Sequence, residues 1–211
     1  MQSMTAATPH LVLFARYHTP GKCKTRLIPA IGAEAAAGLH RHLTERTVGL
    51  LGATAAPVTV ATAGAQTAAF EFWLGSKIGF EEQVEGGLTE KLLAFIDHAP
   101  VIFFGADTPD LSLEHIGKAI EGLTTHEVVI GPALDGGYYL IGMRAAYPEL
   151  FTSMPWSTDQ VLRETLRRLD ALEIEPLLLD PLSDCDRPDD LQRWPELVPG
   201  HVAVAVQSVG E

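Results

Sequence analysis

The chain has little positive charge. Its 211 residues include 15 lysines and arginines against 27 aspartates and glutamates, which gives a formal net charge of -12. Broad binding to nucleic acid requires many phosphates to be neutralised, so this composition argues against a nucleic-acid partner. A local basic patch could still bind one small phosphorylated ligand.

Cysteines and long apolar runs are also scarce. The two cysteines, Cys23 and Cys185, are too few for a disulfide framework. No apolar run approaches the roughly 20 residues that a membrane span needs. Residues 1–10 lack the basic and apolar regions of a signal peptide. We therefore expect a cytoplasmic protein without a membrane span. The composition does not tell which oligomeric state the protein has.

Several familiar catalytic motifs are missing. The sequence has no H-E-x-x-H and no cysteine–histidine spacing typical of zinc sites. It has no G-x-G-x-x-G, and the loop 16–26 lacks the first glycine of a Walker A motif. Any nucleotide chemistry must therefore depend on other residues.

Alternating apolar and amphipathic segments indicate an α/β protein. Strands are predicted at 11–15, 58–62, 80–84, 101–104, 128–130, 138–141 and 174–179. Helices are predicted at 33–51, 66–74, 89–98, 112–123, 158–172 and 188–194, with Thr89, Ser112 and Ser157 or Thr158 as N-caps. This order predicts a three-layer α/β fold. We expect one domain over residues 1–211, with its core in 11–195.

One aspartate follows directly after a predicted buried strand. The apolar run 101–104 stops at Gly105, and Asp107 lies two residues after this glycine. The carboxyl ends of strands are where open α/β sheets bind their ligands. A poorly solvated carboxylate there favours a cation, and Mg²⁺ holding a phosphate is common in nucleotide-using enzymes. Asp107 is therefore a candidate catalytic residue and metal ligand.

A basic loop follows the first predicted strand. Arg16, Lys22, Lys24 and Arg26 lie within it, in a chain that is otherwise acidic. Lysine offers phosphate a mobile point charge and arginine offers a bidentate fork, while Gly21 allows close backbone approach. The pattern predicts a phosphate-binding loop; the alternative is a solvated loop that balances nearby carboxylates.

A double glycine lies between two other predicted strands. Asp135 precedes Gly136 and Gly137 there, and Asp-Gly between apolar runs is a strong hairpin signal. The glycines also permit close backbone approach to a ligand. Both interpretations can hold together, and they make Asp135 a candidate for orienting an acceptor hydroxyl or acting as a base.

Acidic residues crowd the segment 180–190. Asp189 and Asp190 follow Pro188 and would complement a helix dipole. Asp184 and Asp186 have no such role, so they are candidates for metal ligation, with surface turn chemistry as the alternative. The segment 155–159 predicts a capped helix start whose aromatic residue could line a cleft.

Five ordered segments carry a family resemblance: 20–27, 105–111, 132–142, 156–158 and 184–191. Together they resemble a bacterial family of uncharacterised GT-A-type transferases, often named glycosyltransferase or nucleotide-diphospho-sugar transferase. The chain is more distantly similar to phospholactate and molybdopterin guanylyltransferases. The resemblance implies a Rossmann-like GT-A fold with a mixed, mostly parallel sheet.

The resemblance also implies site roles. Asp107 and Asp186 would be ligands of Mg²⁺ or Mn²⁺, and Lys22, Lys24 and Arg26 would hold nucleotide phosphates. Segment 86–92 would lie near the nucleoside or the acceptor. The expected substrates are a nucleotide or nucleotide-sugar and a small-molecule acceptor. The G-x-G-x-R loop of nucleotidyltransferases is missing, which counts against nucleotidyl transfer with pyrophosphate release. The alternatives are such a nucleotidyltransferase or a non-catalytic nucleotide or phosphometabolite sensor.

Overall fold

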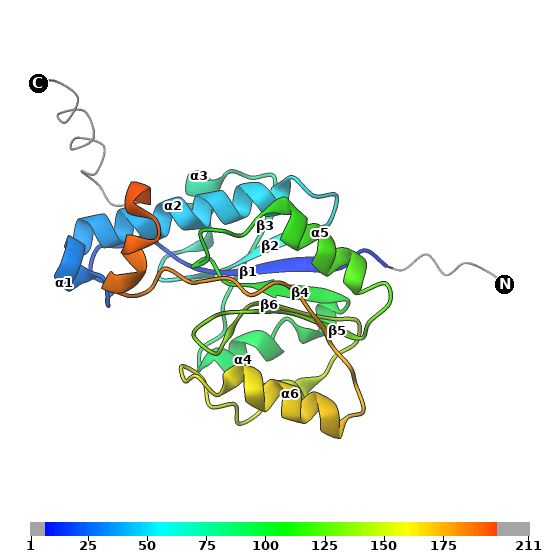
Figure 1. Cartoon of the computed structure of the whole chain (residues 1–211). Helices are drawn as coiled ribbons and strands as arrows, with labels where there is room; N and C mark the ends of the chain where they lie inside the picture. Colours follow the sequence, from blue (N-terminus) through cyan, green and yellow to red (C-terminus); the bar gives the residue numbers. More distant parts are fainter. Residues whose placement is uncertain (1–6, 198–211) are drawn as a thin grey trace, which may run out of the picture.

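A seven-stranded sheet forms the centre of the molecule (Figure 1). The computed structural model describes residues 7–197, and the predicted domain's ends, 1–6 and 198–211, lie outside the described residues. The strand order is β3-β2-β1-β4-β6-β5-β7. The strands are β1 (His10–Arg16), β2 (Val58–Ala63), β3 (Gly79–Glu82), β4 (Val101–Phe104), β5 (Val128–Pro132), β6 (Tyr138–Met143) and β7 (Leu177–Leu178).

The sheet is mixed but mostly parallel, as expected. Strand β6 is antiparallel to both its neighbours, β4 and β5, and every other pairing is parallel. The antiparallel pair β5–β6 confirms the predicted hairpin. Strands β1, β4, β5 and β7 therefore end at one edge of the sheet, and the β5–β6 turn lies at that same edge.

Helices cover both faces of the sheet (Figure 1), which confirms the three-layer α/β fold. One face carries α2 (Ala33–Gly52), α3 (Thr67–Leu74) and α5 (Leu113–Gly122), and the other carries α4 (Leu88–Leu93) and α6 (Val161–Ala171). Side chains of β1 alternate between the two cores: Leu11 and Leu13 pack in one, and Val12 in the other.

A third apolar cluster lies beside the basic loop. It joins α1 (Ile28–Ile31) and α2 to the 3₁₀ helix Pro188–Gln192 through Leu27, Cys185 and Leu191. Three further 3₁₀ helices are Ile96–His98, Pro148–Leu150 and Pro195–Leu197. The cluster fixes the acidic segment against the loop.

Some predicted boundaries are wrong. The helix predicted at 89–98 is divided into α4 and a 3₁₀ turn, and Gly87 rather than Thr89 is the N-cap of α4. The Thr89 hydroxyl instead donates to the carbonyl of Phe151 at 2.8 Å. The Thr89 hydroxyl therefore forms a hydrogen bond with a distant segment instead of capping the helix as the local pattern predicts.

Helix α6 begins at Val161, later than predicted, and Gln160 precedes it without a side-chain cap. The Thr158 hydroxyl donates to the carbonyl of Pro155 at 2.7 Å and so builds a turn before the helix. Ser112 caps α5 as predicted. Strand β7 covers less than the predicted 174–179, and the helix predicted at 188–194 is a 3₁₀ helix that ends at Gln192. In the part of the chain described, no helix combines the length and apolar character needed to cross a membrane.

Candidate active site

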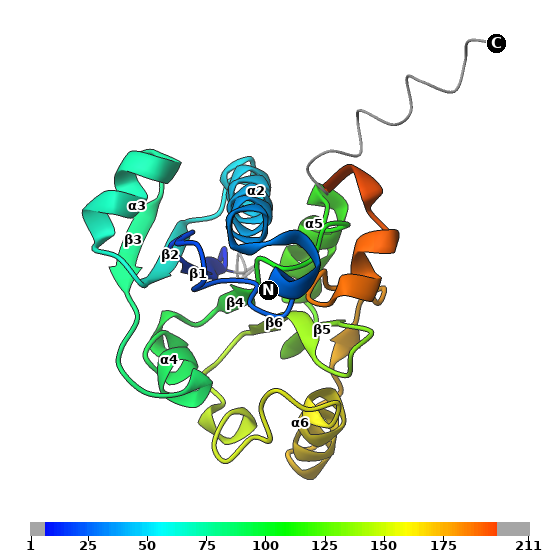
Figure 2. The ribbon, with the colours of Figure 1, turned by 90° about the vertical axis from the view of Figure 1, so that its left-hand side faces the viewer.

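Three segments that carry carboxylates follow strands at the edge of the sheet where the parallel strands end, and this edge faces the viewer in Figure 2. Asp107 follows β4, Asp135 lies in the β5–β6 turn, and Asp184 and Asp186 follow β7. The pKa of Asp184 responds to the charges of the other three, so all four share one electrostatic environment. The sheet topology thus collects acids that are widely separated in the sequence.

The ammonium group of Lys24 links two of these carboxylates. Its Nζ lies 2.6 Å from Asp107 Oδ1 and 2.8 Å from Asp186 Oδ1. It also donates to the carbonyl of Cys185 at 2.8 Å, so all three N–H donors of the ammonium have acceptors. The Lys24 side chain is only 3% exposed. Lys24 is therefore a buried cation at the junction of the basic loop, β4 and the acidic segment.

Burial and charge compete within this group. Burial alone would lower the pKa of Lys24, but Asp107 and Asp186 outweigh it and hold that pKa above its usual value. Partial burial would likewise raise the pKa of Asp107, yet the charge and hydrogen bond of Lys24 hold it below its usual value. Both groups are therefore ionised at neutral pH.

Asp184 is a carboxylate that the predicted metal pair, Asp107 and Asp186, does not include. Burial, together with the charges of Asp107, Asp135 and Asp186, raises the pKa of Asp184 to about 6, although Thr108 donates to its Oδ1 at 2.5 Å. The sequence does indicate Asp184 as a candidate metal ligand, because neither Asp184 nor Asp186 has a role at a helix start. The cluster carries more negative charge than Lys24 alone neutralises.

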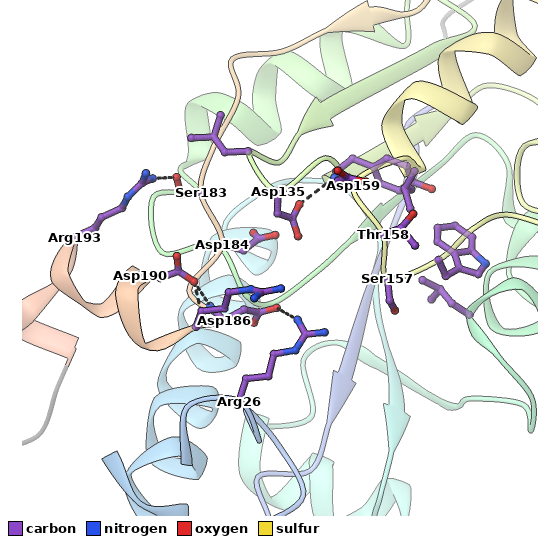
Figure 3. A pocket seen from close by; sticks show the side chains of 17 residues that line it. Arg26, Asp135, Ser157, Thr158, Asp159, Ser183, Asp184, Asp186, Asp190 and Arg193 are labelled. Carbon is purple, nitrogen blue, oxygen red and sulfur yellow. Dashed lines mark hydrogen bonds and ion pairs between the residues drawn. The ribbon is translucent and has the colours of Figure 1, made fainter. Parts of the chain in front are cut away.

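Two cavities meet at this cluster. The smaller, of about 360 Å³, is called the basic cavity because Arg16, Lys22, Arg26 and His40 line it, with Lys24 and Asp107 at its wall. The larger, of about 710 Å³, is shown in Figure 3 and includes Asp135, Asp184 and Gly137 in its lining. Arg26 and Asp186 line both cavities. The structure thus brings Lys22, Lys24 and Arg26 together with Asp107 and Asp186 in the lining of one cavity.

The three glycines predicted to allow close approach of a ligand, Gly21, Gly136 and Gly137, differ in their relation to the cavities. Gly137 lines the larger cavity and donates its N–H to Asp135 Oδ1 at 2.9 Å. Gly136 has φ +92°, and a Cβ there would lie 2.4 Å from the carbonyl oxygen of Asp159. Gly136 therefore packs the hairpin turn against the opposite loop. Gly21 has φ +77° and forms the turn within the basic loop.

Trp156 lines the larger cavity, whereas the sequence indicated only that this aromatic residue could line a cleft. Its Nε1 donates to Thr89 Oγ1 at 2.8 Å, which connects the segment before α6 to α4. Leu88 lines the larger cavity beside it. Segment 86–92 therefore contributes Leu88 to the cavity and Thr89 to the anchoring of Trp156.

The family follows from the sequence match. A bacterial family described as an uncharacterised protein conserved in bacteria (DUF2064) matches residues 47–158, more than half of the chain. The chain belongs to this family. Among curated proteins, none is significantly similar in sequence to this DUF2064 member.

Solved structures agree with the fold. A protein from Desulfovibrio desulfuricans G20, provisionally named a nucleotide-diphospho-sugar transferase, is 32% identical over 87% of this DUF2064 chain and 84% of its own, with a TM-score of 0.81. Two more distant structures show the same fold. CMP:2-keto-3-deoxy-manno-octonic acid synthetase complexed with CTP is 14% identical, with coverages of 89% and 96% and a TM-score of 0.53. Rv0371c of Mycobacterium tuberculosis H37Rv complexed with manganese is 18% identical, with coverages of 92% and 99% and a TM-score of 0.51.

Proposed function

We propose that the protein is a metal-dependent transferase acting on a nucleotide or nucleotide-sugar, with glycosyl transfer to a small acceptor as its reaction. The observation that carries the proposal is the junction of the two cavities at Arg26 and Asp186. A phosphate group in the basic cavity would lie beside the carboxylate cluster, and the larger cavity would hold the acceptor. The 32% identical relative, named for nucleotide-diphospho-sugar transfer, supports this substrate class.

The donor atoms fit a divalent cation. Asp107, Asp184 and Asp186 offer oxygen, the ligand that Mg²⁺ and Mn²⁺ prefer, and the cluster carries excess negative charge. Among residues 7–197, no group of three or more carboxylate, histidine or cysteine side chains is already arranged around a metal position. Mg²⁺ commonly uses one or two carboxylates and completes its shell with substrate phosphates and water. We therefore assign Asp107 and Asp186 as ligands of a metal that arrives with the phosphates.

The chain's own residues supply binding and orientation. Lys22 and Arg26 would hold phosphate oxygens from the basic cavity, and Lys24 would fix the positions of Asp107 and Asp186. A bound metal would neutralise negative charge on the phosphates as the leaving group departs. Asp135, held by the N–H of Gly137, would orient the acceptor hydroxyl or accept its proton.

A thermal-shift screen of nucleotides and nucleotide-sugars, with and without Mg²⁺ or Mn²⁺, tests the binding step. A ligand at 100 times its Kd stabilises the folded state by about 2.7 kcal/mol, so a true ligand should raise the midpoint. We expect the rise only with metal present and expect Arg26→Gln to abolish it. Arg167→Gln on the exposed face of α6 is the matched control. No midpoint change with any nucleotide would contradict the proposal.

Product analysis separates the candidate reactions. Glycosyl transfer releases a nucleoside diphosphate, whereas nucleotidyl transfer releases pyrophosphate. The fold shared with the CTP-bound synthetase makes nucleotidyl transfer the second candidate. Tight binding without turnover across acceptors and nucleotides would instead support a sensor and reject both reactions.

Removing the Lys24 charge should strengthen metal binding in the absence of nucleotide. In Lys24→Met, the two carboxylates that face the ammonium would face each other without a cation. We expect Mn²⁺ to bind at least about 10-fold more tightly, because Coulomb repulsion between the two carboxylates favours a replacement cation. Electron paramagnetic resonance of free Mn²⁺ measures the change. Lys22→Met is the control, and equal affinities in both variants would refute the expected competition.

A further inference from the structure

The lining of the larger cavity comes from two parts of the chain that differ in charge (Figure 3). Its three arginines are Arg26 of the basic loop and Arg187 and Arg193, which flank the 3₁₀ helix Pro188–Gln192. We call this part the arginine lobe, and its lining also includes Asp184, Asp186 and Asp190. The lining residues from 134–161, together with Leu88, include no basic side chain; we call this part the Trp156 lobe. Arg26 also lines the basic cavity, and Figure 3 shows Arg193 across the larger cavity from Asp159 of the Trp156 lobe.

Trp156 is held in one orientation. Its ring stacks on Phe151 with centroids 6.4 Å apart and an interplanar angle of 23°. Tyr138 meets it edge-on at 6.4 Å, and Thr89 accepts its indole N–H. Thr89 is itself fixed by its bond to the Phe151 carbonyl. A fixed aromatic wall can bind an apolar ring face with little loss of conformational entropy.

The polar groups of this lobe are hydrogen-bond acceptors. Asp135 and Asp159 line it, and Asp184 lies at its boundary with the arginine lobe. Each uses Oδ1 for a protein donor: Gly137 for Asp135, Gln160 for Asp159 and Thr108 for Asp184. Within the described residues, the Oδ2 atoms of these three carboxylates receive no hydrogen bond. They can therefore accept from ligand hydroxyl or ammonium groups.

We propose that the Trp156 lobe binds an uncharged or amino-substituted hydroxyl-rich ring and excludes a ring that carries phosphate or carboxylate. The C–H face of such a ring would stack on Trp156, and its hydroxyls would donate to Asp135 and Asp159. An anionic ring would meet these carboxylates with no lobe cation to balance it, which raises the cost of desolvation. This inference rests on the proposed function and defines its substrate class.

The ring could come from a free acceptor or from the sugar of a nucleotide-sugar. In the second case, the diphosphate would lie toward Arg26 and the sugar toward Trp156. Both sources present the same chemistry to the lobe. The experiment therefore has one arm for each source.

The first arm compares glucose, glucosamine, glucuronate and glucose 6-phosphate by ligand-observed NMR titration. The second compares UDP-glucose with UDP-glucuronate, each referenced to UDP alone, in the presence of Mn²⁺. We expect the neutral or amino ring to bind at least about 10-fold more tightly than its anionic counterpart in at least one arm. Selectivity in the first arm identifies a free acceptor, and selectivity in the second alone identifies the donor sugar.

Two variants connect the selectivity to the lobe. Trp156→Leu should weaken binding of the neutral ring by about 10-fold, with Trp73→Leu on α3 as the matched control. Asp159→Asn should reduce the discrimination against anions by about 5-fold and is informative even if Trp156→Leu does not fold. Asp170→Asn on α6 is its control.

The inference would be overturned if anionic rings bound as tightly as neutral ones, or if neither arm showed ring binding. Failure of the proposed function looks different. In that case UDP and other nucleotides would not bind with Mn²⁺, while the first arm would still report selectivity for free rings. Nucleotide binding without ring selectivity would leave the proposed function standing and reject this inference alone.

Discussion

Replacing Asp107 with asparagine is expected to weaken metal-dependent nucleotide binding by at least about 100-fold, since the change removes a charged metal ligand. Asparagine keeps the shape of the side chain, and Asp107 is 43% exposed, so the fold should persist. Lys24 would lose one of its two carboxylate partners, at a cost of about 1–3 kcal/mol in the free energy of unfolding. Calorimetric titration of nucleotide with and without Mn²⁺ measures the binding effect.

Two controls separate lost binding from lost stability. Asp110→Asn changes another acid of the same turn, whose Oδ1 accepts from Trp194 Nε1. It should leave metal-dependent binding within about 2-fold of the parent. The double variant Lys24→Met and Asp107→Asn removes one charge of each sign and should recover part of the stability without recovering binding. If Asp107→Asn bound nucleotide and Mn²⁺ like the parent, Asp107 would not be a metal ligand.

Gly136→Ala is expected to destabilise the protein by about 2–4 kcal/mol, because two effects act together. The backbone has φ +92°, which a residue with a Cβ rarely adopts, and the new Cβ would lie 2.4–2.8 Å from backbone atoms of Asp159. The N–H of Leu162 also donates to the carbonyl of Gly136 at 2.9 Å, so the turn has little freedom to move. Urea denaturation measures the change in the free energy of unfolding.

Gly137→Ala is the matched control one residue away. Its nearest contact would be the Asp135 carboxylate at 3.2 Å, a side chain that can shift. We expect a loss below about 1 kcal/mol. Comparable losses in the two variants would show that the Gly136 contact with the Asp159 loop does not fix the turn. In Gly136→Ala, displacement of the turn should also move Asp135 away from the larger cavity.

Local patterns predicted most elements because they depend on short-range physics. The apolar run at 101–104 is buried as β4, and Asp-Gly-Gly between two strands forms the β5–β6 hairpin. The capping predictions for Thr89 and Ser157 or Thr158 were wrong, since these hydroxyls have several partners available. Thr89 bonds to Phe151, a choice that depends on contacts between distant segments.

The sequence indicates individual residues of the candidate site, but not which of them contact each other. Asp107, Asp135 and Asp186 each follow a strand that the sequence predicts, and the sheet topology brings these strand ends to one edge. That Lys24 holds phosphate stays a prediction, and the structure pairs Lys24 with Asp107 and Asp186. Trp156 was recognised only as an aromatic residue that could face a cleft, because its anchoring through Thr89 connects separate elements.

The sequence by itself determined the class of fold and the chemical types available to the site: a basic loop, acids after strands and a glycine turn. Hydrophobic periodicity and turn chemistry act over a few residues, so these features can be recognised in the chain alone. Only the tertiary structure decided which charges face each other. Lys24 is a buried counter-ion, and Trp156 and three arginines from distant segments line one cavity. Such pairings depend on packing between distant segments, where burial makes an unpaired charge costly and so selects its partners.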